Sequence, residues 1–483
     1  MSATVLLSFI IGYFVLLLII SYFTSRNADD NSFFIGNKKS PWYLVAFGMI
    51  GVSLSGVTFM SVPGYVGTSQ FSYMLIVLGY LVGYFIIATV LLPMYYRLNL
   101  TSIYTYLDQR FGKSSYLAGA SFFLLSRTIG ASFRMFLVIN VLQVFVLETW
   151  GIPFWVSVLV FIISIILYTY EGGIKTIIWT DTLQTTFMLA GVIISVILVS
   201  KELGLSFTDL IKKVSDSEYS KMFYTDWHDK RFYLKQFLSG IFIAIVMTGL
   251  DQEMMQKNLS CKNLKEAQKN IFTFSFIMVL VNFLFLFLGA VLYLYATKKG
   301  IAIPERTDNL FPMIAFNYLG AIASLVFMIG IVSAAFPSAD GALTALTTSV
   351  CVDFLGFNSF STLSKEQKKR WRYIIHFSFA ALLFIVILIF KAVNNEAVIS
   401  AIFTAAGYTY GPLLGLYSFG LFTKYSVKDK WVPAVAIASP IICYILNVYS
   451  EILFNGYVFG FELLILNGLI TFSGLFLLRK KQI

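Results

Sequence analysis

The stretch GMIGVSLSGVTFMSVPG, residues 48–64, decides how this chain folds. It holds four glycines, a proline, three serines and a threonine, yet long apolar segments lie on both sides of it. Inside a bilayer, an interrupted helix is tolerated only where it is buried in protein or lines a wet cavity. Its freed carbonyls are able to coordinate a cation, and its freed N–H groups to meet an anion or a hydroxyl. The alternative is that these small residues serve close helix packing.

Composition predicts an all-α integral membrane protein. Of the 483 residues, 58% are hydrophobic and 12% are charged, which is about half the charged fraction of a soluble domain. Segments of about 20 apolar residues cross a bilayer, and no alternating strand pattern competes with them. About 13 transmembrane helices are expected, at residues 3–24, 41–68, 72–96, 115–147, 151–170, 176–200, 236–257, 269–297, 308–354, 371–392, 396–423, 431–450 and 456–479.

The distribution of basic residues predicts the orientation in the membrane. If the segment after the first helix is cytoplasmic and the helices alternate, 22 of the 35 Lys and Arg residues lie inside and 11 lie outside. The positive-inside rule then places the N-terminus outside and the C-terminus in the cytoplasm. Because the net charge of +11 is scattered over short loops, it indicates contact with anionic lipid and argues against nucleic acid as a partner.

Four of the ionisable residues within predicted membrane spans are candidates for a functional role, because such groups are costly there. Asp181 lies at the inner end of the sixth span and Asp340 well inside the ninth. Arg127 and Arg134 are seven residues apart and therefore share a helix face. The arginines are suited to a substrate carboxylate or polyol. The alternative is that they neutralise buried acids. Oxygen-rich surroundings suit a hard monovalent cation rather than a transition metal.

Four motifs resemble the sodium/solute symporter family. They are GVSLSGVTFMSVPG (51–64), YTYEGGIKTIIWTDTLQ (168–184), DQEMMQKN (251–258) and AAFPSADGALTALTTS (334–349), in that order. The resemblance implies a five-plus-five inverted-repeat (LeuT-like) core, at about 41–200 and 236–423, with one helix before it and two after. It also implies sodium-driven import of a small organic solute by alternating access, by a monomer in the bacterial cytoplasmic membrane.

The resemblance further implies a main sodium site. The family uses backbone carbonyls of the broken helix, here Gly51 and Leu54, and a carbonyl and hydroxyls of a later helix, here Ala334 and Ser338. Where the family often has a serine pair, this chain has Pro337 before Ser338, so one hydroxyl ligand is replaced.

A second sodium site occurs in some members of the family. It uses the aspartate of the WTD motif, here Asp181, and hydroxyls a little beyond the serine pair. This chain has Asp340 at the hydroxyl position, followed by Gly341. The carboxylate either strengthens a sodium site or takes up a proton, because a buried carboxyl near another carboxylate is pushed toward its neutral form.

The family's substrate pocket maps onto the broken helix and its neighbours. A sugar, a sugar acid and another small carboxylate all remain open as the solute. Besides the two arginines, the matching positions are Ser53, Ser55, Thr58, Tyr73 and either Tyr408 or Tyr410.

The leading hypothesis is therefore a sodium-coupled symporter that uses no organic cofactor and is not an enzyme. Proton coupling through Asp340 is the alternative within transport. A membrane-embedded enzyme would need a carboxylate pair or a nucleophile facing a headgroup, and the sequence offers neither. A membrane-bound sensor would need an output domain, and the longest predicted loop, 201–235, is too short for one.

Overall fold

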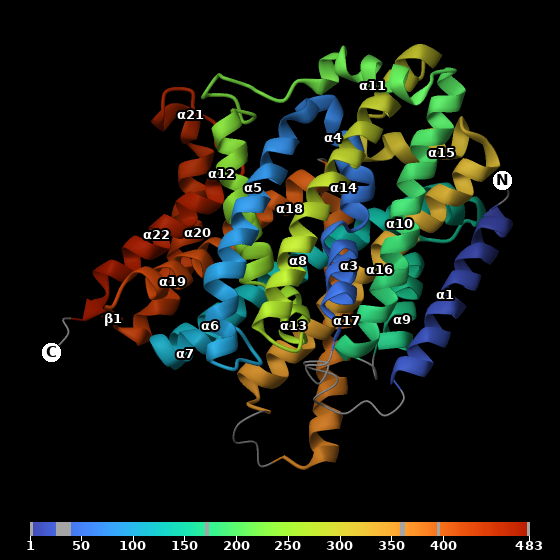
Figure 1. Cartoon of the computed structure of the whole chain (residues 1–483). Coiled ribbons are helices and arrows are strands. Elements are labelled where there is room, and N and C mark those ends of the chain that lie inside the picture. The colour runs from blue at the N-terminus through green and yellow to red at the C-terminus, as the bar shows by residue number, and fades with distance from the viewer. Residues whose placement is uncertain (1–2, 26–39, 170–172, 358–362, 394–396, 481–483) are drawn as a thin grey trace.

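The computed structural model describes residues 3–25, 40–169, 173–357, 363–393 and 397–480. The basic residues predicted for the cytoplasmic segment 26–39, and Tyr170–Gly172 of the second motif, lie outside this described part. The described residues form an almost entirely helical protein (Figure 1). This confirms the all-α prediction. One small sheet is the exception: β1 (Ser426–Val427) pairs antiparallel with β2 (Arg479–Lys480).

The first half of the chain forms the following α-helices and 3-10 turns: α1 (Ala3–Ser25), α3 (Trp42–Ser53), α4 (Gly56–Ser69), η2 (Gln70–Ser72), α5 (Tyr73–Ile86), α6 (Leu92–Arg97), α7 (Thr105–Arg110), α8 (Lys113–Leu142), η5 (Glu148–Trp150), α9 (Phe154–Thr169), α10 (Gly173–Leu203), α11 (Phe207–Ser215) and η6 (Glu218–Ser220).

The second half continues in the same manner: α12 (Tyr233–Ala244), α13 (Gln252–Leu259), α14 (Leu264–Lys299), η8 (Thr307–Asn309), α15 (Leu310–Asn317), α16 (Gly320–Ser349), α17 (Lys365–Val393), α18 (Val398–Thr409), α19 (Gly411–Phe422), η10 (Asp429–Trp431), α20 (Val432–Val448), α21 (Ser450–Leu453) and α22 (Leu463–Leu477).

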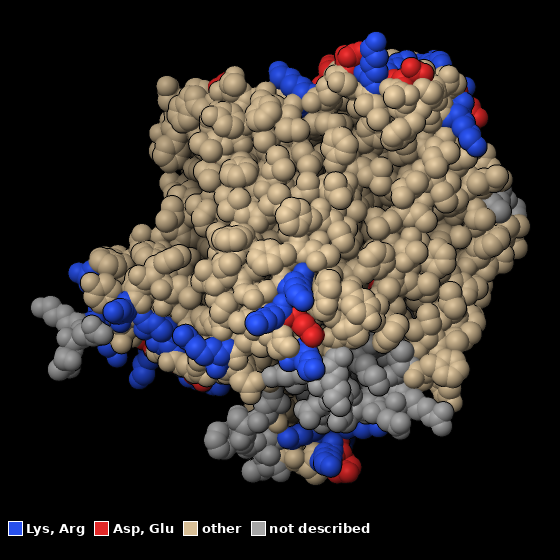
Figure 2. Space-filling model, viewed as in Figure 1, with Lys and Arg blue, Asp and Glu red and all other residues tan. Residues whose placement is uncertain are grey.

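Long apolar helices account for the membrane character. Among the described residues, 8 helices are long and apolar enough to cross a bilayer, or up to 9 if a bent pair counts as one span, and further apolar helices are shorter. Each of the 13 predicted segments contains helix, although 456–479 becomes helical only at Leu463. That there are 13 crossings stays a prediction. Figure 2 shows a broad band of surface almost free of Lys, Arg, Asp and Glu, with charged residues gathered at the two ends of the molecule.

The first interrupted helix lies where the opening stretch predicts it. The first half, α3, ends at Ser53, and the second half, α4, begins at Gly56. At the break, the Leu54 N–H still donates to the Ile50 carbonyl at 2.8 Å, but the last carbonyls of α3 have no further turn to bond. The break is buried, as backbone of this kind must be in hydrocarbon.

A second interrupted helix is not predicted from the sequence. The segment 236–257 is expected to be one continuous span, but the chain bends by 64° between Tyr233–Gly249 and Gln252–Leu259. Asp251 caps the second piece, α13, because its carboxylate accepts a hydrogen bond from the Met254 N–H at 3.2 Å. The part of the motif DQEMMQKN expected to follow the span is thus a buried helix inside the bundle.

Glycines bring the core helices into close contact. A side chain at Gly240 of α12 would collide with the Ile76 carbonyl of α5, and one at Gly79 of α5 with the Phe237 carbonyl of α12. Small residues at helix interfaces allow this approach inside a membrane. The packing of α3, α10 and α16 against one another forms the second close contact, and it carries the ion-binding candidates.

Candidate functional site

A cavity lies beside the break between α3 and α4. Its volume is about 80 Å³, several times the ~10–15 Å³ that one water molecule needs. Four residues predicted from the resemblance, Ser53, Ser55, Thr58 and Tyr73, line it together with Arg134. The other lining residues are Val57, Tyr80, Tyr84, Ile243, Ala244, Met247, Thr248, Met278, Asn282, Ile399, Ile402 and Phe403.

Arg134 is the cationic residue of this cavity. It projects from α8 and is half-buried. Among the described residues, no carboxylate forms an ion pair with its guanidinium. A guanidinium of this kind presents a planar fork of donors that matches a carboxylate. Ser55 and Thr58 line the same cavity, and a guanidinium with hydroxyl groups near it is a chemistry suited to a small anion that bears hydroxyl groups.

A tyrosine face on α5 forms one wall of the cavity. Tyr73, Tyr80 and Tyr84 lie seven and four residues apart, so they share one side of the helix. The sequence interpretation names only Tyr73, although this spacing is a signal that would have found the other two. The Tyr73 ring stacks on Phe403 of α18, with ring centroids 6.4 Å apart.

Access to the cavity differs between its two ends. Phe403 also lines a second pocket of about 350 Å³, which includes Lys230 and Arg231 and lies at the α11 end of the molecule. At the opposite end, the Gln252 side chain accepts a hydrogen bond from the Ile103 N–H at 3.0 Å and donates to the Thr101 carbonyl at 2.9 Å. Phe403 thus lines both the cavity and the pocket on the α11 side, whereas hydrogen bonds of Gln252 join the chain segments on the other side.

The predicted main sodium site faces the same break. Ile331, Ala334 and Ser338 of α16 are spaced three and four residues apart and share a helix face. That face packs on the break, because a side chain at Gly56 would lie 3.5 Å from Ile331 Cδ1. The Ser338 hydroxyl donates to the Ala335 carbonyl at 3.0 Å, which leaves its oxygen lone pairs available for a cation.

The remaining predicted ligands of that site adjoin it. Gly51 lies against Thr185 of α10, whose hydroxyl donates to the Asp181 carbonyl at 2.7 Å and the Phe47 carbonyl at 3.2 Å. Pro337 lies inside α16, where it has no N–H to offer the Ser333 carbonyl four residues earlier. The oxygen donors that suit sodium are thus backbone carbonyls and hydroxyls around a loosened part of α16.

Ion pairs and hydrogen bonds link a series of buried side chains, the buried charged chain, from the end of α18 through α8 and α13 to α10. The Tyr410 hydroxyl donates to Asp251 at 2.9 Å, and Arg127 contacts both Asp251, at 3.7 Å, and Glu253. Lys257 continues the chain, and its Nζ lies 3.7 Å from Glu253 Oε1. It ends at Asp181, where Lys257 Nζ donates to Oδ2 at 2.6 Å.

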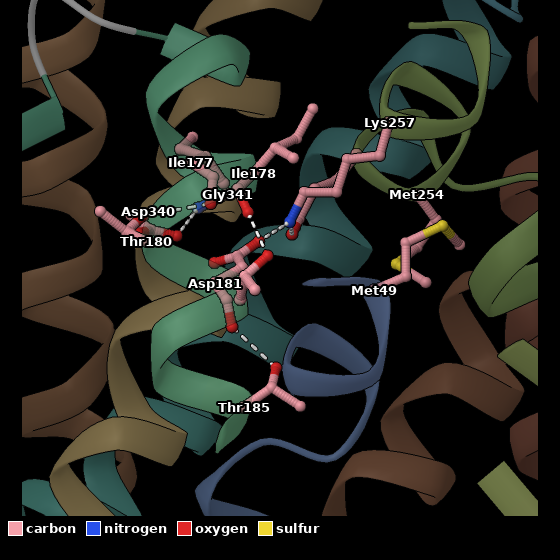
Figure 3. Close-up of polar contacts among 12 residues, drawn as sticks. Met49, Ile177, Ile178, Thr180, Asp181, Thr185, Met254, Lys257, Asp340 and Gly341 are labelled. Atoms are coloured by element: carbon pink, nitrogen blue, oxygen red, sulfur yellow. Dashed lines mark hydrogen bonds and ion pairs between the residues drawn. The ribbon is translucent and has the colours of Figure 1, made fainter. Parts of the chain in front are cut away.

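The predicted site residues therefore fall into separate groups. In the described part of the chain, Arg127 and Tyr410 belong to the buried charged chain and do not line the cavity. Tyr408 points elsewhere, because its hydroxyl accepts a hydrogen bond from Asn447 of α20 at 2.9 Å. Asp181 is paired with Lys257, and Figure 3 shows Asp340 and Gly341 of α16 near this pair.

The sequence interpretation does not identify three residues of the buried charged chain as candidates. Asp251, Glu253 and Lys257 are each at most 1% exposed, yet the sequence interpretation uses them only as part of a motif at the end of the seventh span. An aspartate followed two residues later by a glutamate is a helix-start signal. That signal would have indicated a new helix at 252 rather than a loop.

Comparison with known proteins gives a consistent result. A model of the sodium:solute symporter family matches residues 33–428. The sodium/sialic acid symporter SiaT of Proteus mirabilis is 24% identical over 441 residues, which cover 88% of this chain and 86% of that protein. The sodium/sialic acid symporter NanT of Aliivibrio fischeri is 22% identical over 465 residues, covering 93% and 89% of the two chains.

Solved structures share the fold. A sodium-coupled sialic acid symporter in a substrate-bound, outward-open state superposes with a TM-score of 0.83 at 20% identity and covers 99% of both chains. Mhp1, a nucleobase-cation-symport-1 transporter, superposes with a TM-score of 0.57 at 14% identity over 90% of this chain and 91% of its own.

Proposed function

The chain belongs to the sodium:solute symporter family, and we propose that the solute it carries with sodium is a sugar acid or another small carboxylate bound by Arg134. Membership makes it a multi-pass membrane transporter rather than an enzyme, with sodium as the co-transported ion. The finer assignment of the solute depends on one observation. Arg134 reaches the cavity without a carboxylate partner among the described residues.

The charge of Arg134 supports this assignment. A guanidinium at the edge of a cavity within the bilayer is costly unless an anion meets it. The ion pairs of Arg127 satisfy that arginine inside the protein, so Arg134 is left for the solute. The hydroxyl and tyrosine side chains around it supply hydrogen bonds for the sugar part of a sugar acid. The two bacterial relatives named above are symporters of sialic acid, which carries both kinds of group.

The sodium ion is proposed to bind at the break, between the carbonyls of Gly51 and Leu54 and the carbonyl and hydroxyl of Ala334 and Ser338. Its charge stabilises the contact between α3 and α16, so that sodium favours one state of the alternating-access cycle. We further propose the bacterial cytoplasmic membrane as the location, with the N-terminus outside. The α11 end, where Phe403 lines both the cavity and the second pocket, is then the extracellular side.

Uptake into proteoliposomes tests this function. Labelled solutes are offered in sodium, potassium and choline buffers: sialic acid, its methyl ester, glucuronate, glucose and lactate. We expect sodium-dependent uptake of one or more of the acids and none of the uncharged methyl ester. Sodium-dependent uptake of glucose, with none of the acids, would overturn the role of Arg134 and leave the family assignment intact.

A further inference from the structure

The ion pair between Lys257 and Asp181 lies at the place where two acids of neighbouring helices meet. Asp181 belongs to α10, and Asp340 interacts with it electrostatically from α16. The Lys257 ammonium reaches this place from α13, with Nζ 2.6 Å from Asp181 Oδ2. Both side chains are at most 1% exposed, so the ammonium acts there as a fully buried cation.

We propose that Lys257 is a built-in cation that occupies the position a second sodium ion would need, so that the protein binds one sodium ion per cycle. The inference rests on the proposed function, because it takes the site at the α3–α4 break to be the remaining sodium site. The carboxylates of α10 and α16 require a positive charge between the helices, and the chain supplies it covalently.

The pairing of the other charged groups supports this assignment. Arg127 is committed to Glu253 and Asp251, so Lys257 is the cation that meets Asp181 among the described residues. A sodium ion placed about 4 Å from the ammonium would be disfavoured by roughly a thousandfold in affinity, even at an effective dielectric constant of about 20. Sodium and the ammonium therefore exclude each other at Asp181.

A glycine of α16 also makes room for this group of charged side chains. A side chain at residue 341 would collide with Glu253 Oε1, so Gly341 leaves the space in which that carboxylate lies. Glu253 in turn keeps its Oε1 atom 3.7 Å from the Lys257 ammonium. Two buried oxygens, Asp181 Oδ1 and Glu253 Oε1, have no hydrogen-bond partner among the described residues. Removal of the ammonium would leave both oxygens available to a sodium ion.

The test is to count sodium ions bound to the purified full-length protein, with ²²Na⁺ in equilibrium dialysis and no solute present. We expect one ion for the wild type and two for Lys257→Gln. Addition of Asp181→Asn to Lys257→Gln should return the count to one. The control is Lys262→Gln, which removes an exposed lysine five residues along the chain and should leave the count at one. Two ions in the wild type, or one in a folded Lys257→Gln protein, would overturn the proposal.

A measurement on the wild type alone covers the case in which Lys257→Gln does not fold. One sodium ion with one monovalent anion moves no net charge, so initial uptake should not respond to a potassium diffusion potential set with valinomycin. Uptake that rises when the interior is negative indicates more than one sodium ion and overturns the proposal. Absence of any sodium binding would instead count against the proposed function, and failure of every acid as a solute leaves the sodium count unaffected.

Discussion

The hydroxyl of Thr185 occupies the space that a side chain at Gly51 would need. Thr185 belongs to α10 and Gly51 to the last turn of α3, so the missing Cβ sets how closely the two helices pack beside the broken segment. The same hydroxyl bonds the carbonyls of Asp181 and Phe47 and thereby joins both helices. The sodium site proposed at the break therefore adjoins a contact that contains no charged group.

The first prediction concerns this contact. Gly51→Ala forces α3 and α10 apart, and we expect the sodium concentration for half-maximal uptake to rise by roughly tenfold, about 1.4 kcal/mol. Thr185→Ala removes the colliding oxygen, and the remaining Cβ lies at an ordinary distance of 3.5 Å. The double variant should recover most of the sodium affinity. If the double variant is weaker than either single one, the collision is not the cause.

The second prediction concerns the ligand on α16. Ser338→Ala removes one hydroxyl from the proposed sodium site, and we expect the half-saturating sodium concentration to rise by roughly fivefold, about 1 kcal/mol. Ser324→Ala serves as the matched control, because Ser324 is a buried serine of the same helix that bonds only nearby carbonyls. The measurement is solute uptake as a function of sodium concentration in the two variants. Equal sodium dependence in both variants would remove Ser338 from the site.

The third prediction separates substrate binding from coupling at Arg134. Arg134→Lys keeps the charge but loses the fork of donors, so the KM for the acidic solute should rise by roughly 10- to 100-fold. Sodium binding without solute should be unchanged. Arg97→Lys, at an exposed arginine, is the control. A normal KM in the Arg134→Lys protein would show that the solute carboxylate binds elsewhere.

The fourth prediction concerns Arg127, which shares a helix face with Arg134 in the sequence but pairs with acids of α13. Arg127→Gln leaves buried carboxylates without a partner, and we expect a loss of about 3–5 kcal/mol of stability. Thermal unfolding should show this loss, and addition of Glu253→Gln should reduce it. The folded fraction of the Arg127→Gln protein should transport the solute with the KM of the wild type. A large rise in this KM would show instead that Arg127 contacts the solute.

The fifth prediction concerns pH at the loop before α12. The Arg231 guanidinium donates to Asp229 at 2.7 Å, to the Thr68 carbonyl at 3.2 Å and to Gln70 at 3.1 Å. Hydrogen bonding to Arg231 holds the pKa of Asp229 below its usual value. A lowered pKa stabilises the folded loop above the ordinary value of about 3.9, and this stabilisation is lost as the pH falls below it.

Hydrogen exchange of residues 216–232 measures this loss. Exchange, corrected for its intrinsic pH dependence, should rise below about pH 4 in the wild type. In Asp229→Asn it should be raised already at neutral pH and change little with acid. A wild type with no acid-dependent step would show that Arg231 holds the loop through its other two partners alone.

The break at Leu54 is predictable from the local composition, whereas the one at Leu250 is not. Glycine, serine and proline surround the first break and weaken a helix locally. The second follows GIFIAIVMTG, which has the composition of a continuous apolar helix, and Asp251 resembles the start of an aqueous loop. Asp251 caps the new helix locally, but only tertiary packing, which buries Asp251 beside Arg127, places that helix inside the bundle.

Tertiary packing also decides the different roles of Arg127 and Arg134. Their seven-residue spacing places them on one face of α8, and that much is predictable. Which of them meets an acid depends on Glu253, 126 positions further along the chain. The cavity hydroxyls of Ser55 and Thr58 were within reach of sequence reasoning because they lie in the broken helix itself.

Four helices run into a π-helical turn, at η3 (Ile87–Leu91), η4 (Gln143–Leu147), η7 (Ile245–Gly249) and η9 (Val350–Phe354). Such a turn holds one residue more than an α-helix needs. In η7 the extra residue sets which side chains, Met247 and Thr248, face the cavity. Loss of one residue there would rotate the following positions by about 100° and present a different surface to the solute. Insertions and deletions at this turn therefore offer evolution a route to new solutes that leaves the contact of α3 with α16, the proposed sodium site, unaltered.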